Sequence, residues 1–206
     1  MHVTALPAGL RRFTLADLPR ERWRNGAGWT RTVASAEGTA PHAPPDWRVS
    51  LAEISQGAPF SLFPGLDRTA VLAKGGPVVL RGSVPEPDGH TRQWPLNVPG
   101  DLAHFAGETP MDNAPPEHEA LIWNVMARRG HVRAQVHVHQ GLPLTVPATG
   151  HSLIWVLHGT FLVRTAEGHD LFLLAADEGL HHPGPSAGLT LEPASPEARL
   201  VCTHLR

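Results

Sequence analysis

The chain has 206 residues, a formal net charge of -2, 41% hydrophobic residues and 17% charged residues. A chain of this length and composition has enough apolar side chains for a sizeable core, which excludes a disordered protein. It has no block of basic residues, so the electrostatic pattern of nucleic-acid binding is missing. No apolar run approaches the roughly 20 residues that span a membrane, so no membrane association is expected.

Two further features bear on location. The single cysteine, Cys202, cannot form an internal disulfide, which suits a reducing compartment. The first residues lack the basic start, apolar stretch and cleavage site of a secretory signal peptide. We therefore expect a cytoplasmic protein.

Glycine and proline, with 20 and 21 residues, are spread along the chain between short segments of alternating polarity. This pattern predicts an all-β fold with many turns and minimal helix. One short helix is expected over residues 14–23, with Thr14 as its N-cap and Asp17 near its start.

The first part of the chain contains five expected strands, over residues 29–36, 46–55, 68–73, 77–82 and 119–130. The third and fourth flank Lys-Gly-Gly-Pro, which predicts a hairpin between them. Residues 83–93 resemble an exposed loop, because they are polar and rich in turn-forming residues.

Alternation within two of these strands separates their side chains into opposite faces. Arg48, Ser50 and Ala52 share one face of the strand over 46–55. One face of the strand over 119–130 similarly carries Ile122, Asn124 and Met126.

A second series of strands begins near residue 131, with segments at 131–139, 151–165, 169–179, 187–193 and 198–205. The segment 151–165 contains a central glycine turn and so predicts two strands. We expect an N-terminal half over residues 1–130 and a C-terminal half over 131–206. Two cupin-like β-barrels, or jelly-roll halves, packed into one bicupin unit fit this pattern.

Three segments also resemble the HutD/Ves family. They are WRNGAGWTRTV at 23–33, DWRVSLAEISQGAPFSLFPGLDRTAVLAKGG at 46–76, and LIWNVMARRG at 121–130. The resemblance implies a bicupin fold and an association with histidine utilisation. It also implies a regulator that binds a small pathway metabolite such as urocanate or formylglutamate.

The sequence departs from the family pattern at one motif, which reads Asn25-Gly26-Ala27-Gly28 where the family usually has three glycines after the asparagine. Ala27 is a mild change if its φ is negative and a costly one otherwise. Trp29, at a position that is commonly small or polar in the family, would alter selectivity if it touched the ligand.

Arg68 is the leading candidate for ligand binding. It follows a turn and opens a strand, where its guanidinium can hold a carboxylate by two charge-assisted hydrogen bonds at a barrel mouth. Asp67 is expected to orient this arginine or to accept an N–H group of the ligand. The alternative is a structural Asp-Arg pair that fixes the turn.

The turn before Arg68 supplies three further candidates. Phe60 and Phe63 would wall a pocket and exclude water, or would simply belong to the core. Ser61 is a candidate hydroxyl donor but lacks the His/Asp pattern that activates a nucleophile. Gly65 is expected to have a positive φ.

Four polar residues outside the turn complete the expected pocket. Arg48 and Ser50 share a strand face, which would be solvated if it did not line the pocket. Asn124 interrupts an apolar strand, where an asparagine is disfavoured unless its amide is used. Asn25 precedes a glycine and would otherwise serve only as turn chemistry.

The 14 histidines offer a competing hypothesis of a metal site. His137 and His139 share a strand face with a spacing that metal cupins use, but no acidic residue follows between Gln140 and Leu144. His151, His181 and His182 would be needed to complete such a site. We expect no metal and no other cofactor.

The sequence thus favours a protein that binds a small carboxylate metabolite, without catalytic residues and as a possible homodimer. A cupin enzyme, either an isomerase or a hydrolase and with or without metal, is the alternative. A purely structural or partner-binding β domain is the third hypothesis, against which the polar strand faces argue.

Overall fold

The computed structural model describes residues 9–23, 26–38, 45–85 and 91–206. The chain forms two compact units. The first unit combines Met1–Asp17, of which residues 9–17 are described, with Ala134–Arg206. Leu18–Arg133 forms the second unit. Among the described residues, no helix is long and apolar enough to cross a membrane.

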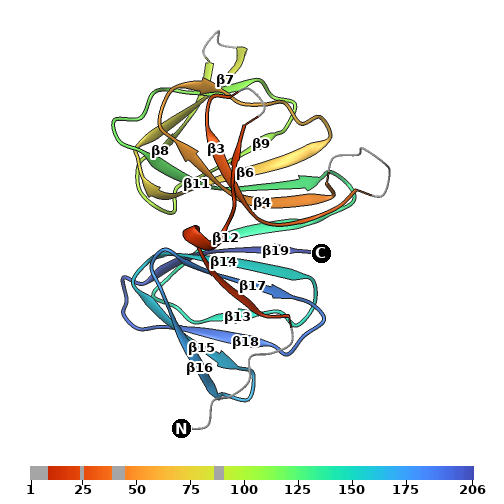
Figure 1. Ribbon diagram of the computed structural model, residues 1–206, viewed down its shortest axis with the longest axis vertical. Helices are drawn as coiled ribbons and strands as arrows, with labels where there is room; N and C mark the ends of the chain where they lie inside the picture. The colour runs from red at the N-terminus through yellow and green to blue at the C-terminus, as the bar shows by residue number, and fades with distance from the viewer. Residues whose placement is uncertain (1–8, 24–25, 39–44, 86–90) are drawn as a thin grey trace. The chain divides into compact units, whose positions relative to one another are not determined.

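The unit Leu18–Arg133 is built from two antiparallel sheets (Figure 1). The larger sheet has the strand order β2 (Arg20–Arg22), β3 (Trp29–Ala36), β4 (Trp47–Ile54), β11 (Ala120–Arg128), β6 (Leu66–Gly75) and β9 (Leu102–Ala106). The smaller sheet has the order β5 (Ala58–Pro59), β10 (Met111–Asn113), β7 (Val78–Pro85) and β8 (Thr91–Leu96).

The other unit also has two antiparallel sheets. Its larger sheet has the order β1 (Arg11–Thr14), β17 (Glu178–Pro183), β14 (His151–His158), β19 (Arg199–Leu205) and β12 (Ala134–Gln140). Its smaller sheet has the order β13 (Leu144–Val146), β18 (Leu189–Pro193), β15 (Thr160–Thr165) and β16 (Asp170–Ala175).

Strand pairing is nested in both units. In the unit Leu18–Arg133, β7 pairs with β8, β6 with β9, β5 with β10 and β4 with β11. In the other unit β15 pairs with β16, β14 with β17, β13 with β18 and β12 with β19. This nesting is the topology of a jelly roll, a long hairpin folded over on itself. The predicted all-β fold with jelly-roll units is therefore confirmed.

Each unit buries apolar side chains that come from both of its sheets. In the unit Leu18–Arg133, Leu72 and Ile122 of the larger sheet belong to one cluster with Leu80 and Leu96 of the smaller one. Inward-facing residues alternate along each strand, so both sheets contribute to the core. The same face of the larger sheet carries polar residues toward one end, and these form the site described below.

Most predicted strands are present, but three predictions about elements are wrong. Where a loop is expected over residues 83–93, β7 extends to Pro85 and β8 begins at Thr91. The other two errors concern the predicted helix and the predicted hairpin.

Residues 14–23 contain only a three-residue 3-10 helix, Leu15–Asp17, and the rest includes strand β2. The Asp17 carboxylate accepts hydrogen bonds from the Thr14 amide and hydroxyl, each at 2.8 Å, which closes a single turn.

The last of these errors concerns the predicted hairpin around Lys-Gly-Gly-Pro. Strands β6 and β7 lie in different sheets, so this connection carries the chain from one sheet to the other. Gly75 and Gly76 have φ values of 71° and 91°, a conformation that favours glycine. The glycines therefore mark a crossing between sheets, which local sequence does not distinguish from a hairpin.

The N-terminal strand belongs with the C-terminal part of the chain. Strand β1, red in Figure 1, pairs with β17, which is blue. Phe13 is 1% exposed and stacks on Trp155, with 5.8 Å between ring centroids. The units therefore differ from the expected halves 1–130 and 131–206 in two ways. The start of the chain, up to Asp17, belongs to the C-terminal unit, and the later boundary lies between Arg133 and Ala134.

Candidate functional site: an arginine-lined cavity

A cavity of about 570 Å³ lies within the unit Leu18–Arg133. Alternation explains its back wall, because every second residue of β4, β6 and β11 faces inward. The register places these residues in rows across the three strands. One row is Arg48, Met126 and Arg68, and the next is Ser50, Asn124 and Ala70.

Seven of the nine residues predicted to bind ligand line this cavity: Arg48, Ser50, Phe60, Ser61, Phe63, Arg68 and Asn124. The strand faces predicted for residues 46–55 and 119–130 are therefore confirmed. Asn25, another predicted residue, lies outside the described residues.

Arg68 is 9% exposed, so it lies deeper than the rim position that the sequence suggested. Its Nη2 donates a hydrogen bond to Asn124 Oδ1 at 2.9 Å. Among the described residues, no carboxylate pairs with Arg68, and its Nε has no acceptor. Burial lowers the pKa of Arg68 to about 10, so the side chain is still charged at neutral pH.

Three phenyl rings surround the Arg68 guanidinium. Its Cζ lies 5.4 Å from the centroid of Phe60, 5.5 Å from that of Phe63 and 5.1 Å from that of Phe105. The ring faces partly compensate the charge and keep water away. The dehydrated guanidinium retains hydrogen-bonding capacity that a planar anion would satisfy.

The amide of Asn124 is held in one orientation. Its oxygen accepts from Arg68, so its Nδ2 points to Ser50 Oγ, at 3.4 Å. All three residues are buried. This explains the polar residue in an apolar strand: Asn124 links Arg68 to Ser50 across the inner face of three adjacent strands.

Arg48 is a second cation at the cavity. Its Nε donates to Thr32 Oγ1 at 3.1 Å. Its Nη2 lies 3.6 Å from a Glu21 carboxylate oxygen, beyond hydrogen-bonding distance, and is without an acceptor among the described residues. Because the Glu21 side chain is 51% exposed, water screens this ion pair.

Asp67 does not line the cavity, which corrects its predicted role. Neighbouring residues of a strand face opposite ways, so Asp67 points outward where Arg68 points inward. The Asp67 carboxylate accepts from Arg129 Nε at 2.8 Å, and Arg129 also binds Glu108. This surface network holds the pKa of Glu108 at about 2, chiefly through its hydrogen bond with Arg129.

The segment between β5 and β6 forms the rim of the cavity. Phe60 N donates to Met111 O and Phe63 N to Gly107 O, each at 2.8 Å. The Arg129 amide donates to Gly65 O at 2.9 Å. Gly65 has a φ of 79°, as predicted. These bonds fix the turn that carries the two phenylalanines over Arg68.

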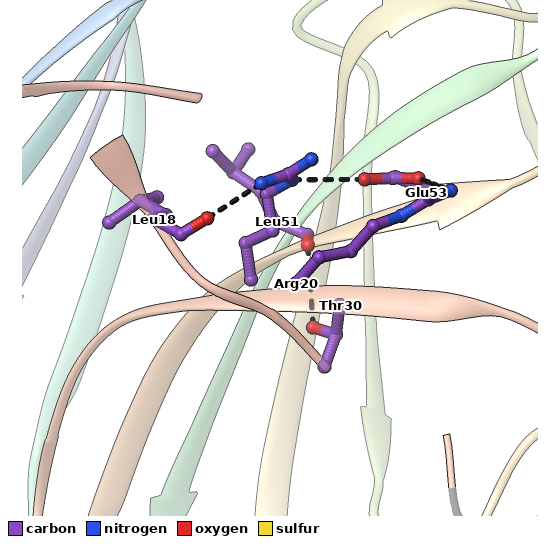
Figure 2. Close-up of polar contacts among 6 residues, drawn as sticks. Leu18, Arg20, Thr30, Leu51 and Glu53 are labelled. Atoms are coloured by element: carbon purple, nitrogen blue, oxygen red, sulfur yellow. Dashed lines mark hydrogen bonds and ion pairs between the residues drawn. The ribbon is translucent and has the colours of Figure 1, made fainter. Parts of the chain in front are cut away.

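The edge strand β2 supplies another wall with Glu21 and Arg22, and Trp23, the residue after it, extends this wall. Figure 2 shows polar contacts that hold β2 and β3 to the neighbouring strand β4. Arg20 and Arg31 both bind the Glu53 carboxylate, at 2.5 and 3.0 Å, and Arg31 Nη1 donates to Leu18 O at 2.6 Å. Thr30 lines the cavity and donates to Leu51 O at 3.3 Å.

The two departures from the family motif have simple structural explanations. Among the non-glycine residues that the structure describes, Asp177 has a positive φ and Ala27 does not, so alanine is tolerated at Ala27. Trp29 precedes the inward-facing Thr30, and its ring packs against the Arg20 guanidinium. The Arg20 Cζ lies 4.4 Å from the Trp29 ring centroid. Trp29 therefore lies outside the cavity.

The histidines predicted as the alternative metal site lie in the other unit. His137 is exposed, and its ring centroid is 6.3 Å from that of His139. His151 Nδ1 and His181 Nε2 are 3.3 Å apart, while His182 Nε2 donates to Ala187 O. In the described part of the chain, no three His, Cys, Asp or Glu side chains gather as metal ligands would.

Some cavity residues were not predicted. Ile122 and Met126 share the face of Asn124, so alternation would have identified them. Glu21 and Arg22 line the cavity from β2, and Phe105, which contacts Arg68, belongs to β9; the positions of these two strands depend on long-range pairing. No local signal in the sequence indicates that pairing.

Two jelly-roll units, each with nested strand pairing and one with a polar cavity, define a cupin-type protein. A family model, described as HutD, matches residues 15–199, and the chain belongs to this family. It is 31% identical over 200 residues to protein Ves of Citrobacter koseri, covering 94% of this chain and 92% of the relative. Protein Ves of Cronobacter sakazakii is 32% identical over 150 residues, which cover 72% and 77% of the two chains.

Solved structures support the same fold. A conserved protein of unknown function from Pseudomonas aeruginosa superposes with a TM-score of 0.76 at 23% identity, covering 96% of this chain and 99% of that one. HutD from Pseudomonas fluorescens gives 0.73 at 18% identity, with coverage of 96% and 100%. An oxalate decarboxylase from Lactobacillus farciminis gives 0.56 at 12% identity, with coverage of 94% and 85%.

Proposed function

We propose that this protein is a regulator of histidine catabolism that binds a small carboxylate metabolite, such as urocanate or formylglutamate, through Arg68. The observation that carries the proposal is a buried, charged guanidinium that faces a cavity with no carboxylate partner among the described residues. An unpaired buried charge destabilises a protein unless a ligand compensates it. The histidine pathway enters through membership of the HutD family.

The arrangement favours binding over catalysis. Asn124 and Ser50 supply the polar groups nearest Arg68, and both belong to a hydrogen-bonded chain that orients the guanidinium. Such a chain fixes donors for a carboxylate and provides no general base. The phenyl rings exclude water and so strengthen the contact between guanidinium and carboxylate.

A thermal-shift panel tests this proposal, with urocanate, formylglutamate, histidine, glutamate and formate as probes. A ligand at about a hundred times its dissociation constant stabilises the protein by about 2.7 kcal/mol. For a chain of 206 residues this raises the thermal midpoint by about 5 to 10 °C.

Arg68→Gln should abolish the shift. Arg81→Gln is the matched control, because Arg81 pairs with Asp112 in the same unit and does not line the cavity. If no carboxylate shifts the midpoint, or if Arg68→Gln shifts as the natural protein does, the proposal is wrong.

A further inference from the structure

We infer that the ligand is a dianion whose two acidic groups bind Arg68 and Arg48 and whose apolar linker lies over Met126. This inference rests on the proposed function, because it assumes that Arg68 binds a carboxylate. It adds a second binding point and thereby narrows the ligand class to short dicarboxylates.

The register of the sheet places the two arginines in one row. Met126 on the central strand β11 is the partner of Arg48 on β4 and of Arg68 on β6. All three side chains line the cavity. The backbones of β4 and β6 are two strand spacings apart, about 10 Å, and both side chains are long enough to reach inward between them.

The charge of the cavity wall also favours a dianion. The charged residues among the described lining are Arg22, Arg48 and Arg68 against Glu21 alone, an excess of two positive charges. Glu21 is exposed and hydrated, so it compensates Arg48 only weakly. A monocarboxylate would neutralise half of this excess.

Both arginines retain nitrogen atoms that are buried without an acceptor among the described residues: Nε of Arg68 and Nη2 of Arg48. The other bonds of each group hold it in place, through Asn124 for Arg68 and through Thr32 for Arg48. Each guanidinium therefore presents an unsatisfied donor that one carboxylate would satisfy.

Met126 supplies the apolar surface between the two cations. It is 5% exposed, and its flexible thioether side chain adapts to methylene groups. Across the strands, an apolar residue thus lies between two cations. This order is complementary to a ligand in which a methylene linker joins two acidic groups. The ligand would then lie across the strands, at the polar end of the cavity.

Titration calorimetry at constant ionic strength tests the inference, with succinate, glutarate and adipate compared against butyrate, valerate and hexanoate. The best diacid should bind about 10- to 100-fold more tightly than its monoacid, which corresponds to about 1.4 to 2.8 kcal/mol. Arg48→Gln should remove this preference without weakening the monoacids. Arg48→Lys, which keeps the charge, should retain part of it, and Arg81→Gln should retain all of it.

The outcomes separate the inference from the proposed function. If diacids and monoacids bind equally well and both need Arg68, the dianion inference is overturned while the proposed function stands. If no acid of either series binds and the carboxylates of the thermal-shift panel are also inactive, both are overturned. The unliganded thermal midpoint of each variant shows whether it is folded. If Arg48→Gln does not fold, the Arg48→Lys variant decides. Its compact ammonium cannot reproduce the contact of a guanidinium, so an unchanged preference for diacids would count against the two-point contact.

Discussion

At the scale of single residues, Asp67 and Arg68 are adjacent acid and base that do not form a pair. Alternation along β6 turns Arg68 into the cavity and Asp67 toward the surface, where it binds Arg129. Arg68 is thereby left with an amide, Asn124, as its hydrogen-bond partner. A buried charge of this kind is costly for folding, which supports the binding role proposed for Arg68.

Replacing Arg68 by methionine should therefore stabilise the unliganded protein by about 1 to 4 kcal/mol, because an apolar side chain replaces a buried charge. The lost hydrogen bond to Asn124 will offset part of this gain. Urea unfolding without added anion measures the difference. A destabilisation of similar size would show that Arg68 is needed for the fold itself.

At the scale of elements, the rim segment between β5 and β6 depends on close backbone packing at Gly107. A Cβ atom at Gly107 would lie 2.4 Å from Phe63 O and 2.8 Å from Leu66 O. The same glycine accepts a hydrogen bond from Phe63 N and donates one to Leu66 O. The position of Phe63 over Arg68 therefore depends on a residue without a side chain.

Gly107→Ala should displace the rim and destabilise the protein by about 1 to 3 kcal/mol, as overpacking does. It should also weaken carboxylate binding, because Phe63 would no longer enclose Arg68. Gly188→Ala is the control, since a Cβ atom there would lie 3.6 Å from its nearest neighbour, an ordinary contact. Chemical denaturation and calorimetry measure both effects, and equal behaviour of the two variants would contradict the argument.

At the scale of the whole molecule, stability should depend on histidines in the unit that joins the start of the chain to its end. His151 and His181 stack with 5.5 Å between ring centroids. Burial, then the nearby His151, Arg11 and His182, lowers the pKa of His181 to about 4. Burial likewise lowers the pKa values of His151 and His204.

A histidine whose pKa is lower in the folded state binds its proton more readily when unfolded. Its contribution is fully present above the unfolded pKa, about 6.5, and is lost as pH falls toward 4. The urea midpoint should therefore decrease as the pH is lowered from about 6.5 to about 4.5. His181→Gln should flatten this pH dependence. His158→Gln, at an exposed position, should not. Parallel pH profiles for all three proteins would contradict the assignment.

The sequence by itself determined many of the strands, the faces of β4 and β11, and seven residues of the cavity wall, since alternation is a local property with a period of two residues. Only the tertiary structure decided that β6 and β7 separate into two sheets and that β1 pairs with β17. It alone brought Phe105 to Arg68 and Arg129 to Asp67. These contacts join segments that are distant in sequence. They form because nested strand pairing buries both sheets of a unit together, and no local pattern encodes that pairing.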